Sequence, residues 1–318
     1  MIGILGAGAF GTALAVALGQ AGRQVRLWAR DARTVAQMQE TRRNDKVLPG
    51  VDLPKTVSVH AEIAEIGGGE AVLLAIPMQT LAGALDLYPE IGQGTPLVAC
   101  CKGVDLTSLR GPVALIRDRR PESVAAILTG PSFAVDIARG LPTALTLAAT
   151  DRGAELQDLL STPTLRLYRT DDITGAELGG ALKNVVAIAA GAVIGAGLGD
   201  SARAALMTRG YAEMVRLAMA LGARPETLAG LSGLGDLVLT CTSTQSRNFR
   251  FGLSLGQGTG FDPSITVEGV ATASAVLRLA EARGVDMPIT AMVDALASGR
   301  IALNDAIGQL MSRPLKQE

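Results

Sequence analysis

The chain opens with IGILGAGAFGTALAVALGQ, residues 2–20, and this stretch decides the fold. Its first apolar run, Ile2–Leu5, is typical of a buried strand, and helical periodicity runs from Thr12 to Gln20. Between them lies Gly6-Ala7-Gly8-Ala9-Phe10-Gly11. In such a strand–turn–helix the first glycine permits the tight turn, the second lets the backbone approach a pyrophosphate, and the third lets the helix pack on the strand. The turn therefore predicts a dinucleotide site; the alternative is a glycine-rich turn without a ligand.

Further apolar runs extend this pattern through the first half of the chain. They lie at Gln24–Trp28, Val57–His60, Ala71–Ile76, Leu97–Cys101, Ala125–Leu128, Ala144–Ala148 and Leu165–Tyr168. Because these runs are continuously apolar and do not alternate, they predict strands covered by helices on both faces. We therefore expect an α/β fold whose N-terminal half, residues 1–172, is a Rossmann-type doubly wound parallel sheet that binds the dinucleotide.

Only helical periodicity is evident after about Asp172. The clearest segments are Gly175–Ile194, Ser201–Leu221 and Thr272–Arg283, and no run there reads as a strand. We expect residues 173–318 to form an all-helical domain that binds the substrate and carries the catalytic group. Two domains also suit a chain of 318 residues.

Composition excludes several classes of protein. Hydrophobic residues make up 48% and charged residues 19%, which supports a large core and argues against disorder. The chain has 29 Lys and Arg against 30 Asp and Glu, and 3% aromatic residues, so nucleic-acid binding is not expected.

Cysteine and histidine contents restrict the chemistry. The 3 cysteines, two of them adjacent (Cys100 and Cys101), form neither a disulfide framework nor spaced metal-binding pairs, which fits a reducing cytosol. A single histidine, His60, disfavours a Ser–His–Asp hydrolase and a zinc enzyme, and no metal cofactor is expected.

Neither a membrane span nor a targeting segment is predicted. The longest uncharged apolar stretch, Asn184 to Gly199, is short and rich in Gly and Ala, so we interpret it as a buried helix. The N-terminus begins directly with a strand and lacks the basic head of a signal peptide. A soluble, cytoplasmic protein is the expectation.

The adenosine end of the cofactor is expected near the close of the second strand, where Arg30 and Asp31 are adjacent. An arginine there favours the 2′-phosphate of NADPH, whereas an acidic residue favours the ribose hydroxyl of NADH. Arg30 therefore indicates NADPH, and Asp31 leaves NADH open. The third interpretation is that both charges lie on a solvated surface and bind no cofactor.

Unusual turns follow three of the predicted strands. They are Ile76-Pro77-Met78-Gln79, Cys101-Lys102-Gly103 and Thr129-Gly130-Pro131-Ser132-Phe133-Ala134. In an open parallel sheet the carboxyl ends of the strands form the ligand crevice, so these turns predict a site. Lys102 by itself could equally be a solvated loop lysine.

Lys183 stands in the otherwise apolar segment 178–199. A buried amine is unstable unless it is paired or has its pKa lowered by desolvation, and a lysine of lowered pKa is a competent general base. The alternatives are a side chain that reaches solvent or one that pairs with Glu177.

Polar residues gather again between Gly233 and Asn248. Gln245-Ser246-Arg247-Asn248 offers a guanidinium and small polar groups that suit a phosphate, although a polar loop with a surface arginine is the alternative. Glu268 adds a carboxylate that could also simply begin a helix.

Taken together, these residues resemble the bacterial NAD(P)-dependent glycerol-3-phosphate dehydrogenase family. The matching segments occur in family order: GAGAFGTALA at 6–15, CKG at 101–103, TGPSFA at 129–134, LGGALKNVVAIAAG at 178–191, TRGYAEM at 208–214, GLGDLVLTCTSTQSRNFRFG at 233–252 and VEG at 267–269. The segment from Gly233 to Gly252 is highly specific.

The resemblance implies reversible hydride transfer from NAD(P)H to dihydroxyacetone phosphate, which gives sn-glycerol 3-phosphate for phospholipid biosynthesis. It places the proton acceptor at Lys183. Implied substrate contacts are Lys102, Gly130, Ser132, Lys183, Asp236, Ser246, Arg247 and Asn248. Implied cofactor contacts are the turn Gly6, Gly8, Ala9, Phe10 and Gly11, together with Arg30, Lys102, Ala134, Arg247, Thr266 and Glu268.

Three positions depart from the family's commonest pattern. Ala9 replaces a frequent serine and leaves only a backbone N–H for the pyrophosphate, Cys101 replaces a serine or threonine, and Thr266 replaces a valine. Whether Asp236 orients Lys183 or binds a substrate hydroxyl is not separable from the sequence.

Other interpretations of the same pattern stay open. One is a keto-acid reductase of ketopantoate or β-hydroxyacid type, with a carboxylate substrate instead of a phosphate ester. Another is a dinucleotide-binding sensor without turnover. The expected partner is a small phosphorylated triose, and a homodimer is common for this class.

Overall fold

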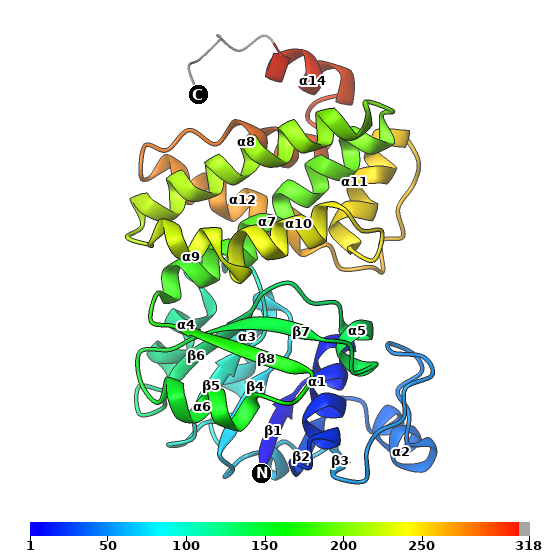
Figure 1. The fold of residues 1–318 in the computed structure, drawn as a ribbon, viewed down its shortest axis with the longest axis vertical. Coiled ribbons are helices and arrows are strands. Elements are labelled where there is room, and N and C mark those ends of the chain that lie inside the picture. The colour runs from blue at the N-terminus through cyan, green and yellow to red at the C-terminus, as the bar shows by residue number, and fades with distance from the viewer. Residues whose placement is uncertain (312–318) are drawn as a thin grey trace. The chain divides into compact units, whose positions relative to one another are not determined.

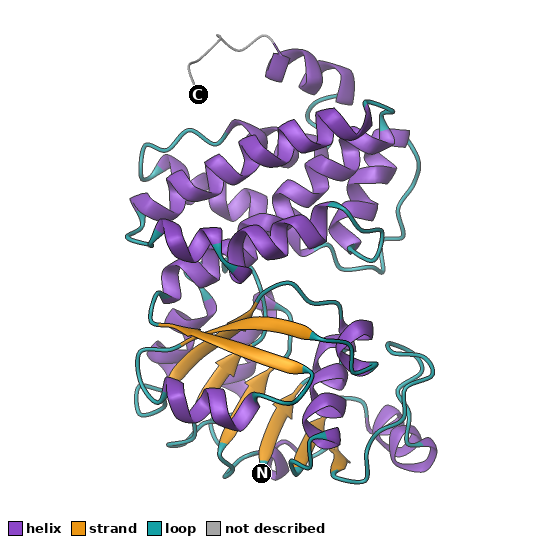
Figure 2. Cartoon of the chain, viewed as in Figure 1, coloured by secondary structure: helices purple, strands orange, loops and turns teal. Residues whose placement is uncertain are grey.

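The computed structural model describes residues 1–311 of the chain. They form two compact units: Met1–Lys102 with Arg110–Glu177, and Gly103–Leu109 with the chain from Leu178 onward. The first unit holds every strand of the described chain, and the second is helical (Figures 1 and 2). The α/β fold class predicted from the sequence is confirmed. The assignment of dinucleotide binding to residues 1–172, and of substrate binding and catalysis to residues 173–318, stays a prediction.

An eight-stranded sheet organises the first unit, in the order β3-β2-β1-β4-β5-β6-β7-β8. Its strands are β1 (Ile2–Leu5), β2 (Val25–Trp28), β3 (Val57–His60), β4 (Ala71–Leu74), β5 (Leu97–Ala99), β6 (Ala125–Thr129), β7 (Thr143–Ala148) and β8 (Leu165–Thr170). Each lies within two residues of its predicted bounds. Strands β1 to β6 pair in parallel, with Ile2 beside Val25 and Ala71.

The sheet departs from the predicted parallel arrangement between β6 and β7. These two strands pair antiparallel, with Thr129 opposite Thr146, and β8 then runs parallel to β7. A continuous apolar run shows that a strand is buried on both faces, but it carries no information on strand direction. The sheet is therefore doubly wound and mostly parallel, with one antiparallel pair at this edge that the sequence did not predict.

Helices cover both faces of the sheet (Figure 2). They are α1 (Ala9–Gln20), α2 (Ala32–Thr41), α3 (Met78–Leu87), α4 (Pro112–Arg119), α5 (Ala134–Ala138) and α6 (Gly153–Leu160), with the short 3-10 turn η1 (Ile63–Ile66). One core cluster joins Ile4 to Leu14 of α1 and Leu156 of α6. The other joins Leu5 to Leu81 of α3 and Ile116 of α4. Successive strand residues thus enter opposite cores, as the pleat requires.

The second unit is built around α7. Its elements are α7 (Ile173–Gly195, whose first turn belongs to the first unit), α8 (Gly199–Ala220), α9 (Pro225–Ala229), η2 (Leu231–Gly235), α10 (Asp236–Cys241), α11 (Arg247–Gln257), α12 (Glu268–Glu281), α13 (Pro288–Ala297) and α14 (Leu303–Met311). Val186 and Ile188 of α7 enter two different core clusters. By length and composition α7 could cross a membrane, but 83% of its most apolar window is buried in the protein, as in a core helix.

Glycines bring α7 and α11 into close contact. A Cβ at Gly252 would lie 1.9 Å from the Ile188 carbonyl oxygen, and one at Gly191 would lie 2.1 Å from that of Phe249. Larger residues would therefore force the two backbones apart. The contact sets the first turn of α11 beside the middle of α7, where Lys183 and Asn184 lie.

Candidate active site

The glycine-rich turn of the first unit has the geometry of a dinucleotide cradle. Gly6 has a φ of +114°, which L side chains rarely adopt. A Cβ on Gly11 would lie 2.0 Å from the Gly6 carbonyl oxygen, whereas one on Gly8 would meet nothing within 4 Å. Gly8 immediately precedes α1, and Ala9 and Phe10 begin that helix. The backbone at Gly8 is therefore open to a ligand at a helix N-terminus.

At the carboxyl ends of β5 and β6 the structure brings three predicted residues together. Lys102 Nζ donates to the Gly130 carbonyl oxygen at 3.2 Å, and Ser132 Oγ donates to the same oxygen at 3.3 Å. Lys102 is partly buried, so it is not a freely solvated loop lysine. Ala134, another predicted residue, begins α5 directly after this turn.

Arg30 and Asp31 have different environments at the end of β2. Asp31 caps α2: its carboxylate accepts from the N–H groups of Arg33 and Thr34, both at 3.2 Å, and from Thr34 Oγ1 at 2.7 Å. The Thr34 hydroxyl and then the Arg33 N–H hold the pKa of Asp31 below its usual value. Arg30 is exposed. The carboxylate is thus already engaged, and the guanidinium faces solvent.

Lys183 and Asp236 form the central cluster of the second unit. Lys183 Nζ donates to Asp236 Oδ1 at 3.0 Å and to Thr240 Oγ1 at 2.7 Å. Lys183 is 7% exposed and Asp236 is fully buried. The ion pair and the hydroxyl offset the desolvation of the amine, so Lys183 neither extends to solvent nor pairs with Glu177. Glu177 instead accepts from the Val113 N–H at 2.8 Å in the first unit.

Thr240 was not predicted as a partner of Lys183, although a signal for it existed. Asp236 and Thr240 lie four positions apart in α10, and residues with that spacing share one face of a helix. Thr240 Oγ1 also donates to Asp236 Oδ1, at 3.3 Å. The hydroxyl therefore holds both members of the ion pair.

The first turn of α11 gathers the predicted phosphate residues. Ser246 is the N-cap, with its Oγ accepting from the Phe249 N–H at 3.2 Å, and Arg247 is exposed in the first helical position. Asn248 is buried: its Nδ2 donates to Asn184 Oδ1 at 2.9 Å, and its Oδ1 accepts from the Gly269 N–H at 2.9 Å. Asn184, next to Lys183, was missed because its partner lies 64 positions away.

The last two predicted cofactor residues lie at the start of α12. Glu268 is the first residue of that helix, which agrees with the alternative that it simply begins a helix. Thr266 is exposed in the preceding loop. Gly269 in the same turn is tied to Asn248 of α11. The turn is therefore anchored to the predicted phosphate residues.

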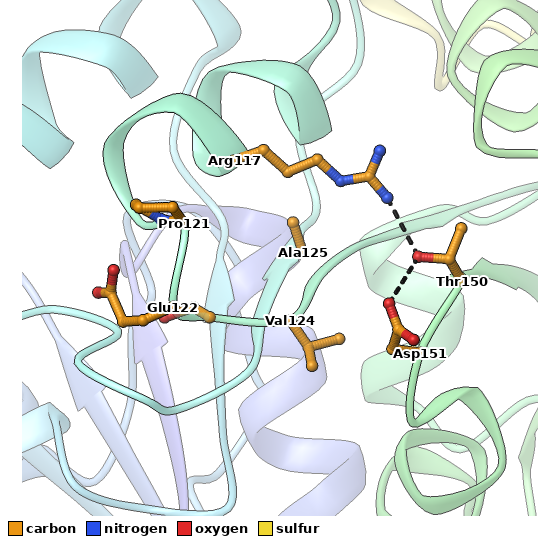
Figure 3. Close-up of a pocket in the computed structure, with 8 residues that line it drawn as sticks. Arg117, Pro121, Glu122, Val124, Ala125, Thr150 and Asp151 are labelled. Carbon is orange, nitrogen blue, oxygen red and sulfur yellow. Dashed lines mark hydrogen bonds between the residues drawn. The ribbon is translucent and has the colours of Figure 1, made fainter.

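A surface depression of about 430 Å³ lies away from all of these residues. It is at the opposite end of β6 from Gly130, where Arg117 donates to Thr150 Oγ1 at 3.1 Å and Thr150 donates to Asp151 (Figure 3). No predicted site residue lines it. Across residues 1–311, no group of three or more His, Cys, Asp and Glu side chains could hold a metal ion.

A doubly wound sheet with an open glycine turn, together with a helical unit that holds a buried lysine–aspartate pair, defines a dinucleotide-dependent dehydrogenase. Two family models match the chain: the NAD-dependent glycerol-3-phosphate dehydrogenase N-terminus at residues 1–155, and the C-terminus of the same family at 172–308. The chain belongs to this NAD-dependent glycerol-3-phosphate dehydrogenase family.

Individual relatives agree with the family models. The NAD(P)+ glycerol-3-phosphate dehydrogenase of Cereibacter sphaeroides is 66% identical over 320 residues, covering 100% of both chains. That of Paracoccus denitrificans is 60% identical over 319 residues, covering 100% of this chain and 99% of the relative. The crystal structure of glycerol-3-phosphate dehydrogenase from Coxiella burnetii has a TM-score of 0.92 at 36% identity and covers 98% of each chain.

The same fold also occurs in a reductase of other specificity. A ketopantoate reductase from Ralstonia eutropha has a TM-score of 0.62 at 17% identity, covering 96% of this chain and 99% of that one. At that identity the likeness shows the fold alone.

Proposed function

We propose that the chain catalyses the reversible NAD(P)-dependent reduction of dihydroxyacetone phosphate to sn-glycerol 3-phosphate. The observation that carries this proposal is the buried amine of Lys183, held by Asp236 and Thr240 in a chain of this family. The nicotinamide, when bound, supplies the hydride, so the protein has to orient the ketone and move one proton. The rest of the mechanism concerns residues of this chain.

Lys183 acts as the proton donor in the direction of reduction. Its ammonium group polarises the C2 carbonyl of the substrate and gives a proton to the oxygen as the hydride reaches the carbon, so an alcohol forms and a neutral amine is left. A proton from solvent restores the ammonium, and in the oxidative direction the neutral amine removes the hydroxyl proton. Asp236, fully buried and bonded to Nζ, orients the amine and stabilises its charged form.

The first turn of α11 binds the phosphate. Arg247 offers a planar set of donors that matches phosphate oxygens, and the helix N-terminus adds backbone N–H groups. Asn248 is fixed by Asn184 and Gly269, which ties this turn to the residue next to Lys183. A substrate held at the phosphate therefore presents its ketone at a defined distance from the amine.

The turn Gly6–Gly11 would hold the pyrophosphate of the cofactor, with further contacts from Lys102, Ala134, Arg247, Thr266 and Glu268 as the family pattern implies. NADPH is preferred to NADH, because Asp31 is engaged in capping α2 while Arg30 is exposed and positively charged. Lys102, Gly130 and Ser132, which share hydrogen bonds in the first unit, complete the set of substrate contacts.

The product is a backbone precursor for phospholipids. The described cysteines, Cys100, Cys101 and Cys241, are buried and form no disulfide, which suits a reducing cytoplasm. The active form is a homodimer, the commonest symmetric assembly.

Purified protein with NADPH and dihydroxyacetone phosphate tests the function directly. Cofactor oxidation that depends on this substrate supports it. Oxidation with keto acids alone would indicate a ketopantoate-type reductase instead, and tight cofactor binding without oxidation of any substrate would indicate a sensor.

A further inference from the structure

The glycine-rich turn recognises its ligand through the backbone alone. Residues 6–11 are Gly-Ala-Gly-Ala-Phe-Gly, and none of these side chains carries an N–H or O–H group. Any hydrogen bond from this turn to a pyrophosphate must therefore come from main-chain N–H groups. Their directions depend on how each peptide plane is oriented, so whatever fixes the planes fixes the site.

Asn44 is a side chain that reaches this turn from a distant loop. It lies between α2 and β3 and is 4% exposed. Its Nδ2 donates to the Ala7 carbonyl oxygen at 2.9 Å and to Thr12 Oγ1 at 2.9 Å. One amide group thus joins the loop both to the glycine turn and to α1.

The bond to Ala7 determines the direction of the next N–H group. The Ala7 carbonyl and the Gly8 N–H belong to one peptide plane, and the described chain has no cis peptide bond. In a trans peptide these two groups point in opposite directions. Because Asn44 holds the carbonyl on its own side, the Gly8 N–H is directed to the other side. A Cβ added to Gly8 itself would also meet nothing within 4 Å.

The loop that carries Asn44 also has anchors of its own. Arg42 donates through its guanidinium to the Pro54 and Val57 carbonyl oxygens at 2.7 and 2.8 Å. The Asn44 carbonyl accepts from the Leu48 N–H at 2.9 Å, and Leu48 packs in a cluster with Ala13 of α1. Asn44 is therefore held in position by the loop itself.

We infer that Asn44 is a positioning residue for the dinucleotide: by holding the Ala7 carbonyl it presents the Gly8 N–H to the pyrophosphate. The inference rests on the proposed cofactor site and adds to it a residue outside the glycine motif. A purely structural role, in which Asn44 only ties the loop to α1, would affect stability and would not distinguish between ligands.

Two ligands separate these roles in an Asn44→Leu variant, which keeps the volume and removes the donor. NADPH contains the pyrophosphate, whereas adenosine 2′-phosphate contains the adenosine end without it. We expect the Kd for NADPH, measured by calorimetry, to rise about tenfold, equivalent to about 1.4 kcal/mol. The Kd for adenosine 2′-phosphate should stay within twofold of wild type. The value of kcat at saturating NADPH should also stay within twofold, because Lys183 is untouched.

Asp45→Ala, which removes the acceptor of the Gly50 N–H in the same loop, and Thr12→Val serve as matched controls. The first loosens the same loop without removing the Asn44 donor, and the second removes the other acceptor while leaving the Ala7 bond. Both should lower the melting temperature and keep the Kd for NADPH within twofold. If Asn44→Leu fails to fold, Asn44→Ala, which also removes the donor and adds no charge, gives the same comparison.

The outcomes separate this inference from the proposed function. If the wild-type protein binds no NADPH, the cofactor site itself is wrong. If wild type binds NADPH but Asn44→Leu binds it equally well, or loses both ligands by the same factor, Asn44 has no role in presenting the Gly8 N–H.

Discussion

The two sites of this molecule are built in different ways. In the dinucleotide turn, residues 6–11 are consecutive and offer only backbone groups to a ligand. In the helical unit, the amine of Lys183 is held by side chains 53 and 57 positions further along the chain. The first site depends on backbone groups of consecutive residues, and the second depends on buried side chains that the fold brings together.

This difference determines how each site should fail. A backbone site tolerates changes elsewhere as long as the peptide planes keep their directions, so its defects should appear in cofactor affinity. A buried charge pair is sensitive to loss of either partner, because the other is left unpaired in a medium of low polarity. Its defects should appear in turnover and in stability.

The largest effect is expected when the amine is removed. Lys183→Ala should lower kcat by about 10²- to 10⁴-fold, the usual contribution of a positioned acid–base group. The Kd for NADPH should stay within twofold, because the glycine turn is unchanged. Steady-state kinetics and calorimetry on the same preparation measure both quantities.

That variant also leaves the fully buried Asp236 without its cation, so its stability should fall by about 3–5 kcal/mol. A double variant, Lys183→Met with Asp236→Leu, removes both charges and should recover stability without recovering turnover. Near-normal turnover in Lys183→Ala would remove this residue from the chemistry.

Substitution of Arg247, the proposed phosphate contact, should give the next largest effect. Arg247→Ala should lower kcat/KM for dihydroxyacetone phosphate by an amount equivalent to about 2–4 kcal/mol, with little change for dihydroxyacetone, which has no phosphate. Arg250→Ala is the matched control, because Arg250 is an exposed arginine of the same helix. Equal losses on both substrates would show that Arg247 acts elsewhere, for example at the cofactor.

A smaller effect is expected in the pH dependence of stability. Burial raises the pKa of Glu177 from 4.5 to about 7, although its carboxylate accepts from the Val113 N–H. Between these values the unfolded chain has released the proton and the folded chain retains it. The free energy of unfolding should therefore fall as pH rises from 4.5 to about 7, by about 2 kcal/mol for this partly buried group. Below pH 4.5 both states are protonated, and the contribution of Glu177 to stability is fully present.

Glu177→Gln removes this titration and keeps an oxygen for the Val113 N–H. Urea midpoints from pH 5 to 8 should show the variant gaining stability over wild type as pH rises. Glu122→Gln, at an exposed position, should follow wild type throughout. If the urea midpoints of Glu177→Gln and wild type changed in parallel with pH, the raised pKa of Glu177 would be contradicted.

The smallest effect concerns cofactor choice. Arg30→Ala should raise the Kd for NADPH about tenfold and leave that for NADH within twofold, because only NADPH carries the 2′-phosphate. Arg23→Ala, another exposed arginine of the same unit, should change neither. An equal loss of both cofactors would place Arg30 at a group that they share.

Sequence patterns predicted the strands and the glycine turn because both are local. Each strand is a short segment rich in apolar residues, and the roles of Gly6 and Gly11 follow from their positions between the first strand and the first helix. Strand direction was not predictable, since β7 is as apolar as the parallel strands yet runs antiparallel to β6.

The partners of the buried side chains were not predictable for a related reason. Lys183 stood out as a charge in an apolar helix. The sequence left three alternatives for it: pairing with Glu177, reaching solvent, or a pKa lowered by burial. None of them included a contact with Thr240. Asn44 and Asn184 carry no local pattern at all; their partners lie 37 and 64 positions away. Contacts of this kind emerge only from the folded chain.

The most direct test of the central claim is a crystal structure of the protein with NADP+ and dihydroxyacetone phosphate, a pair that cannot react. The account predicts Nζ of Lys183 within about 3 Å of the C2 oxygen and the phosphate at the first turn of α11. A C2 oxygen beyond hydrogen-bond reach of Lys183, with that amine turned towards bulk solvent, would contradict it.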